Sequence, residues 1–188
     1  MIEVRNLTKK FNGFTAVDHV SFDVKNSEVF GLLGPNGAGK TTIIRMLSTL
    51  TRPTEGTARI GGYDIVKDDN NVRKLIGLLS EKMIMYDRLT AKENLRFFGK
   101  LYNIPKTLLN QRIDELLALV QLGKWKDSKV GTFSTGMRQR MNVIRALLNM
   151  PKVLFLDEPT LGLDPQSTVE VREFIKKINR ENKTTIIL

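Results

Sequence analysis

Gly34-Pro-Asn-Gly-Ala-Gly-Lys40-Thr41 is the stretch that decides the fold, because it matches the pattern G-x-x-x-x-G-K-[S/T]. A continuous apolar run, Val29 to Leu33, precedes it, and an amphipathic segment, 43–47, follows it. The glycines let the backbone turn its N–H groups inward around phosphate oxygens, and a following helix adds its positive N-terminal end. The stretch therefore predicts a phosphate-binding loop between a buried strand and a helix. Lys40 would reach the β and γ phosphates, and Thr41 would offer a hydroxyl to Mg²⁺.

A second apolar run, Val153 to Leu156, ends in two carboxylates, Asp157 and Glu158. Open α/β sheets bind their ligands beyond the carboxyl ends of the strands, which is where these two side chains would lie. We expect Asp157 to hold the hydration shell of Mg²⁺. Glu158 would orient and deprotonate an attacking water, a contribution typically worth ~10²- to 10⁴-fold in rate. Asp-Glu-Pro would also fit an ordinary strand end that leads into a turn, but the phosphate loop favours the catalytic interpretation.

Apolar periodicity predicts an α/β core that is interrupted by a helical lobe. The segments 2–7 and 20–24 alternate apolar and polar residues, as half-buried antiparallel strands do, and 184–188 is a third buried run. From about residue 90 the spacing becomes helical, with Thr90 and Glu93 forming a capping box. The next helix would stop at Gly123, and Ser134 would begin a third. We expect a mostly parallel sheet in a core of residues 1–81 and 151–188, an N-terminal antiparallel region, and an inserted lobe at 82–150.

Composition restricts the chemistry further. The chain has 188 residues, no cysteine and a single histidine, His19, so disulfides, cysteine zinc sites and histidine metal clusters are excluded. The formal net charge is +10, and residues 81–150 hold 13 basic and 6 acidic side chains. Such a surface attracts nucleic acid or anionic lipid, although a solvated basic face without a partner is equally common. No apolar run approaches the roughly 18 residues that cross a bilayer, and the start lacks a signal-peptide core, so we expect a cytosolic polypeptide.

The order of these motifs resembles the nucleotide-binding domain of ATP-binding cassette (ABC) transporters. The phosphate loop is followed by a helical lobe ending in Phe133-Ser134-Thr135-Gly136-Met137, then by the carboxylate strand, then by Leu161-Gly162-Leu163-Asp164. The resemblance covers the whole chain. It implies a P-loop NTPase core, ATP and Mg²⁺ as cofactors, and ATP hydrolysis as the activity.

The resemblance also assigns site residues. The aromatic side chain that stacks on adenine would be Phe11, with Phe14 as the competing choice. Ser134, Gly136 and Met137 would act in trans on ATP held by an opposing subunit, in a head-to-tail dimer with two sites. Catalytic roles fall on Glu158 and Lys40, and metal binding falls on Thr41, Glu81 and Asp157. Nucleotide binding is implied for a larger set: Phe11, Gly34, Asn36, Gly37, Ala38, Gly39, Lys40, Thr41, Thr42, Glu81, Ser134, Gly136, Met137, Asp157 and Asp164.

The chain departs from the family pattern at three places: the glutamine loop, the signature motif and the switch histidine. Where the family usually has the glutamine of its Q-loop, this chain has Ser80-Glu81. Glu81 could still offer an oxygen to Mg²⁺, but it adds a negative charge near the phosphates. The signature reads Ser-Thr-Gly-Met, a form similar to ATPases that export sodium, drugs, polysaccharides or lipids. The switch histidine of the family would follow the last core strand, beyond Leu188, and we do not expect His19 to replace it. We therefore expect the sequence to be a piece of a longer subunit.

The resemblance implies the motor subunit of a transporter, an exporter by its signature, at the cytoplasmic face of the membrane. Its partners would be a separate membrane permease, docked near residues 82–130, and either a second copy or a related ABC subunit. The alternative is an ABC ATPase that acts on ribosomes or nucleic acid, which the sequence pI of about 9.9 keeps open. That alternative is weaker, because the chain has one cassette and no basic tail, so no nucleic-acid partner is expected.

Overall fold

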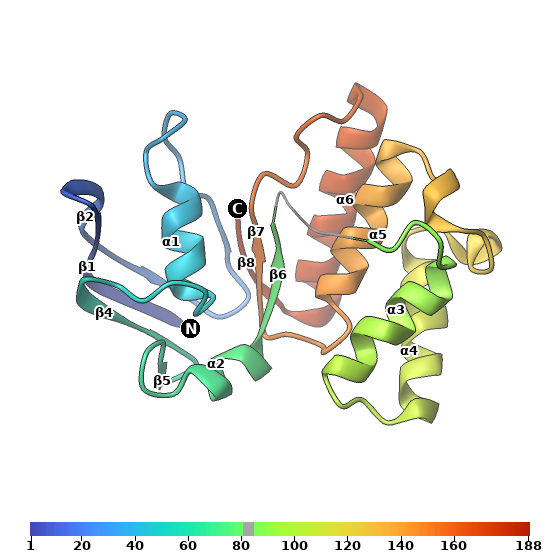
Figure 1. Ribbon diagram of the computed structural model, residues 1–188, viewed down its shortest axis with the longest axis horizontal. Helices are drawn as coiled ribbons and strands as arrows, with labels where there is room; N and C mark the ends of the chain where they lie inside the picture. Colours follow the sequence, from blue (N-terminus) through green and yellow to red (C-terminus); the bar gives the residue numbers. More distant parts are fainter. Residues whose placement is uncertain (81–84) are drawn as a thin grey trace. The chain divides into compact units, whose positions relative to one another are not determined.

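The structure is a computed structural model that describes residues 1–80 and 85–188 (Figure 1). Contacts between Cα atoms divide the chain into two compact units. The first unit comprises residues 1–78, 152–157 and 179–188, and the second comprises residues 79–151 and 158–178. The segment 158–178, which we expected in the core, therefore groups with the helices.

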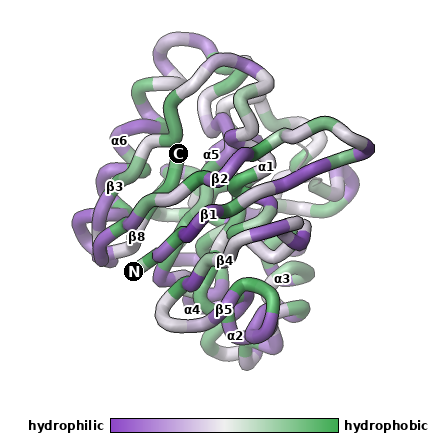
Figure 2. Tube along the Cα trace, turned by 90° about the vertical axis from the view of Figure 1, so that its left-hand side faces the viewer, coloured by the Kyte–Doolittle hydropathy of each residue, from purple (hydrophilic) through white to green (hydrophobic). Residues whose placement is uncertain are grey.

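An antiparallel sheet forms the N-terminal half of the first unit, as predicted. Its strands are β1 (Ile2–Phe11), β2 (Phe14–Val24), β4 (Glu55–Ile60) and β5 (Tyr63–Asp64), in the order β2-β1-β4-β5. Figure 2 shows hydrophilic and hydrophobic segments following each other along β1. The fully buried side chains of Ile2 and Val4 lie on its inner face, because successive residues of a strand point to opposite faces. A register shift between Val4 and Leu7, where Asn6 has φ of 48°, returns the buried side chain of Leu7 to the same face.

A second sheet of the first unit carries strands from both ends of the chain. It contains β3 (Val29–Phe30), β6 (Ile76–Leu79), β7 (Val153–Leu156) and β8 (Thr185–Ile187), in the order β3-β8-β7-β6. The β3–β8 and β8–β7 pairs are parallel. All four residues of β7 are 0% exposed, which confirms the predicted buried strand. The helix α1 (Lys40–Leu47) lies between the two sheets, where Ile43, Ile44, Met46 and Leu47 join their common core (Figure 1).

The predicted strand at 29–33 is shorter and more open than expected. Strand β3 covers only Val29 and Phe30, and the side chains of Val29 and Leu33 are 45% and 97% exposed. Among the described residues β3 pairs with β8 alone, so it is an edge strand with one open side. A continuous apolar run does not distinguish an edge strand from a central one, because the sequence does not say which strands flank it.

Helices make up the second unit. They are α3 (Ala91–Leu101), α4 (Lys106–Leu119), α5 (Thr135–Ala146) and α6 (Pro165–Asn182), with 3₁₀ turns η1 (Gly123–Trp125) and η2 (Val130–Thr132). The short helix α2 (Asp69–Leu75) belongs to the first unit. No helix among residues 1–80 and 85–188 is both long and apolar enough to cross a membrane.

The predicted stop of α4 at Gly123 is wrong. The helix ends at Leu119, and Gln121 adopts the left-handed conformation that glycine usually supplies, with φ of 58°. The Leu122 amide closes the end by donating to the Leu117 carbonyl at 2.8 Å. Burial of Leu122, which is 1% exposed, stabilises this turn, so packing outweighs the local preference of Gly123.

The capping box at the start of α3 is present as predicted. The Thr90 hydroxyl accepts from the Glu93 amide at 3.1 Å, and a Glu93 carboxylate oxygen accepts from the Thr90 amide at 2.8 Å. The backbone hydrogen bond from Thr90, more than any other contact, lowers the pKa of Glu93.

Replacing Thr90 with alanine should lower the free energy of unfolding by ~1 kcal/mol, because one amide of the first turn loses its acceptor. Urea denaturation measures this loss. The matched control is Thr107→Ala, because Thr107 is exposed in the first turn of α4 and caps nothing. Equal stability of Thr90→Ala and the unmodified chain would contradict the capping role.

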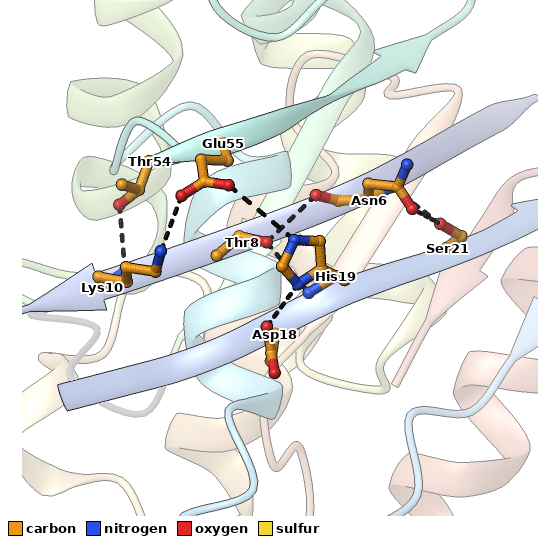
Figure 3. A network of polar contacts seen from close by, with 8 residues as sticks. All are labelled: Asn6, Thr8, Lys10, Asp18, His19, Ser21, Thr54 and Glu55. Atoms are coloured by element: carbon orange, nitrogen blue, oxygen red, sulfur yellow. Dashed lines mark hydrogen bonds and ion pairs between the residues drawn. The ribbon is translucent and has the colours of Figure 1, made fainter.

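His19 lies in a polar network on the antiparallel sheet (Figure 3). Its backbone adopts φ of 46°, and its amide donates to the hydroxyl of Thr8 at 3.0 Å. The imidazole contacts the Asp18 carboxylate, and its Nε2 is 3.9 Å from the carboxylate of Glu55, which also pairs with Lys10 at 2.7 Å. These contacts tie β2 to β1 and β4, in line with a structural role for His19.

Candidate functional site

The predicted phosphate loop leads directly into α1 in the first unit. Gly37 and Gly39 have φ of 82° and 87°, in the left-handed region that favours glycine. A Cβ atom on Gly39 would lie 2.3 Å from the backbone oxygen of Ala16, so no other residue fits there without moving β2. The loop therefore delivers the chain to the start of α1, whose first N–H groups have no partner within the helix and face an anion favourably.

The side chain of Lys40 lies across its own loop. Its Nζ donates to the carbonyl oxygens of Gly34 at 2.7 Å and of Pro35 at 2.9 Å. The apex residues between them, Asn36, Gly37 and Ala38, are exposed. A charged ammonium is thus positioned over open backbone, which is the arrangement that recognises a phosphate chain.

Thr41, at the end of the phosphate loop, contacts Asp157, at the end of the carboxylate strand. Within the described residues this is the one side-chain contact between these two predicted metal-binding segments. The Thr41 hydroxyl donates to Asp157 Oδ1 at 3.0 Å, and Asp157 is only 7% exposed at the end of β7. No group of three or more His, Cys, Asp or Glu residues able to hold a metal occurs within the described ranges. Two hard oxygens still fit Mg²⁺, because this ion usually keeps several of its waters. Thr42 follows half-buried on α1, and Glu81, the third predicted ligand, lies outside the described residues.

Glu158 directly follows Asp157 in the chain and belongs to the second unit. Its side chain is exposed and its backbone adopts φ of 50°, which is uncommon for a residue with a Cβ. The Leu161 amide donates to the Glu158 carbonyl at 3.2 Å, and Gln139 Nε2 donates to the Pro159 carbonyl at 2.7 Å. A turn held at several points thus fixes the backbone that carries this carboxylate.

Within the second unit, Ser167 connects the predicted signature residues to Asp164. The Ser134 hydroxyl accepts from the Met137 amide at 3.3 Å and begins α5, with the Met137 side chain half-buried behind it. Gly136 is buried, and a Cβ there would lie 2.6 Å from Ser167 Oγ. The Ser167 amide donates to Asp164 Oδ1 at 2.9 Å. Ser167 therefore lies between the start of α5 and the cap of α6, and its side-chain hydrogen bond is the main cause that lowers the pKa of Asp164.

Phe11 and Phe14 face each other as the last residue pair of the β1–β2 hairpin. Their side chains are 47% and 66% exposed, and Lys9 Nζ lies 4.9 Å from the centroid of the Phe11 ring. Both rings are open for stacking. Adenine recognition by Phe11 therefore stays a prediction, with Phe14 as the alternative.

Sequence reasoning assigned no role to Ser167 or Gln139. Ser167 carried a weak signal, because it stands three residues after Asp164, the spacing at which a cap bonds to the helix backbone. Gln139 lies within the quoted signature segment, but its acceptor on Pro159 is twenty residues away. No local pattern indicates such a contact.

Comparison with known proteins agrees with this geometry. A sequence family described as "ABC transporter" matches residues 17–161. The linearmycin resistance ATP-binding protein LnrL of Bacillus subtilis is 40% identical over 99% of this chain and 60% of its own length. The bacitracin transport ATP-binding protein BcrA of Bacillus licheniformis is 42% identical over 100% of this chain and 60% of its own length. The chain thus spans about three fifths of these relatives.

Two solved structures are similar over nearly the whole chain. One is an ATP-binding cassette dimer in a post-hydrolysis state with ADP and Pi bound, with a TM-score of 0.85 and 28% identity over 100% of this chain and 86% of its own. The other is cbiO1 from Clostridium perfringens, part of the transporter complex cbiONQ, with a TM-score of 0.87 and 26% identity over 99% of this chain and 76% of its own. The predicted P-loop NTPase fold with an antiparallel sheet and a helical part is confirmed.

Proposed function

Because this chain belongs to the ABC transporter family, we propose that it is the ATP-binding and ATP-hydrolysing part of a transporter subunit that powers a separate membrane permease. The observation that carries this proposal is the Thr41–Asp157 hydrogen bond of 3.0 Å, because it joins the phosphate loop to the end of the carboxylate strand. The hydrogen bond brings two oxygens that could accept a metal to the helix that begins at Lys40, next to the loop amides, and this arrangement supports a site for phosphoryl transfer.

Each residue has a separate task in the proposed reaction. The loop amides and Lys40 would bind the phosphates, while Thr41 and Asp157 would hold Mg²⁺ and its waters, with Glu81 as the predicted third ligand. When bound, Mg²⁺ would neutralise charge that develops on the phosphate oxygens. Glu158 would accept the proton of the attacking water, since its carboxylate is exposed at the turn that directly follows Asp157. Phe11 would stack on adenine.

Partners follow from the same proposal. Ser134, Gly136 and Met137 would contact ATP held by an opposing subunit, either a second copy or a related ABC subunit. The solved relative that forms a dimer with ADP and Pi supports this. A permease would dock against the lobe near residues 82–130, around Glu81, which would hold the subunit at the cytoplasmic face of the membrane. The names of LnrL and BcrA, which concern antibiotic resistance and transport, support an exporter.

The proposal is tested by Asp157→Asn, which keeps the shape of the side chain and removes its charge. The apparent affinity for Mg²⁺ in ATP turnover should fall about 10- to 100-fold, as is typical when a group that orients a metal's ligand sphere is lost. Phosphate release at increasing Mg²⁺ measures it, and Asp114→Asn, at an exposed position of α4, is the control. An unmodified chain that binds no ATP would refute the function, and an unchanged Mg²⁺ dependence would refute the role of Asp157.

A further inference from the structure

One surface of the second unit combines the sole tryptophan of the chain with several lysines. Trp125 ends η1 and is 40% exposed, and Lys124 Nζ lies 5.6 Å from the centroid of its ring. Lys126 and Lys129 follow in the same loop, and Lys92 is brought to it from α3. We call Lys92, Lys124, Trp125, Lys126 and Lys129 the Trp125 patch.

Backbone hydrogen bonds hold the Trp125 patch in one piece. The Lys92 amide donates to the Lys126 carbonyl at 3.0 Å, and the Ala91 amide donates to the Ser128 carbonyl at 3.1 Å. A β-bridge joins Thr90 to Lys129. In Figure 1 the loop between α4 and α5 accordingly runs beside the start of α3. A surface fixed in this way loses little conformational entropy when it binds a partner.

The charges of the patch are available to a partner. None of its four lysines lies within ion-pair distance of a carboxylate in the described part of the chain. The nearest acidic residues in sequence are Glu93 and Asp127, two carboxylates against four lysines, and Glu93 both caps α3 and attracts Lys129. The patch therefore presents an excess of positive charge around an exposed indole.

We propose that the Trp125 patch binds the surface of a membrane that contains anionic lipids. Indole rings favour the boundary between lipid and water, where the ring is in a partly apolar environment and its N–H stays hydrated. Clustered lysines are attracted to anionic headgroups, at about 1 kcal/mol or roughly fivefold in affinity for each lysine. All four cations are lysines, whereas base recognition in nucleic acids draws heavily on the bidentate fork of arginine. The inference rests on the proposed function, because a transporter subunit works beside a bilayer.

Because Trp125 is the only tryptophan, its fluorescence reports on the patch without any label. Vesicles of phosphatidylcholine with phosphatidylglycerol should shift its emission to the blue, and lipids with brominated acyl chains should quench it. Vesicles of phosphatidylcholine alone should do neither. The response should weaken as salt rises, because the Debye length falls from about 10 Å at 0.1 M to about 3 Å at 1 M.

Substitutions in the patch test whether vesicle binding depends on the patch itself or on the overall positive charge of the protein. Lys124→Gln, Lys126→Gln and Lys129→Gln together should reduce co-sedimentation with anionic vesicles by about fivefold per lysine. The control removes the same charge elsewhere, through Lys25→Gln, Lys67→Gln and Lys74→Gln, all exposed in the first unit. Trp125→Ala should also weaken co-sedimentation, whereas Tyr63→Ala, at a side chain 41% exposed, should not.

The outcomes distinguish this inference from the proposed function when ATP binding is measured on the same proteins. Intact ATP binding without any response to anionic vesicles would overturn the lipid site alone. An equal loss of co-sedimentation in the two triple lysine variants would also overturn it, because vesicle binding would then depend on the net charge of the protein and not on the patch. A fluorescence change with an RNA oligonucleotide and none with vesicles would replace it with a nucleic-acid surface. A vesicle response in a chain that binds no ATP would support the patch and refute the proposed function.

Discussion

Replacing Lys40 with alanine is expected to weaken ATP binding about 100-fold or more. The ammonium of Lys40 is held over the phosphate loop by the carbonyls of Gly34 and Pro35, at 2.7 and 2.9 Å. Hydrogen bonds to charged groups contribute roughly 1.5–3 kcal/mol each, and 2.7 kcal/mol corresponds to a factor of about 100 in affinity. Titration with a fluorescent ATP analogue measures the loss.

The control for this variant is Lys67→Ala, which removes one exposed lysine of the same unit outside the loop. Urea denaturation of both variants separates a binding effect from an unfolded loop. Among residues 1–80 and 85–188, the Lys40 side chain bonds only to exposed backbone of its own loop, so we expect the stability of Lys40→Ala to change little. Native affinity in Lys40→Ala would mean that the phosphates bind elsewhere.

The phosphate loop and the carboxylate strand could be predicted because their patterns are local. A loop with φ near 85° at Gly37 and Gly39 needs glycine at those two positions, and the sequence shows both. Burial of Val153 to Leu156 agrees with four consecutive apolar residues, although the same pattern at 29–33 gives only the exposed edge strand β3. In both segments the conformation that the local sequence favours is the one that the structure adopts, so the sequence alone was enough to predict them.

Contacts between distant segments could not be predicted in the same way. A Cβ atom on Gly136 would lie 2.6 Å from Oγ of Ser167, thirty-one residues later in the chain, so a larger residue there would have to displace the Ser167 side chain. The end of α4 differs from the predicted stop for a similar reason, since burial of Leu122 places the left-handed residue at Gln121 instead of Gly123. Such positions depend on which elements pack together, and no periodicity within one segment contains that information.

Replacing Glu158 with glutamine is expected to leave ATP binding intact and to slow hydrolysis by ~10²- to 10⁴-fold. Glutamine keeps the size of the side chain and cannot accept the proton of the attacking water. The backbone should not change, because the Glu158 and Pro159 carbonyls, not the carboxylate, bond to Leu161 and Gln139. Phosphate release under single-turnover conditions measures the rate.

The matched control is Glu115→Gln, which makes the same chemical change at an exposed position of α4. Normal hydrolysis by Glu158→Gln would mean that another group accepts the proton of the attacking water. Blocked hydrolysis has a second consequence, because ATP that is bound and not consumed should keep two subunits together wherever Ser134 and Gly136 act in trans. Light scattering with ATP and Mg²⁺ should then show a dimer that ADP does not produce. Suppose that Glu158→Gln binds ATP, fails to hydrolyse it and stays monomeric. This result would support Glu158 as the base but refute the site shared between two subunits, because that site depends on Ser134 and Gly136 instead.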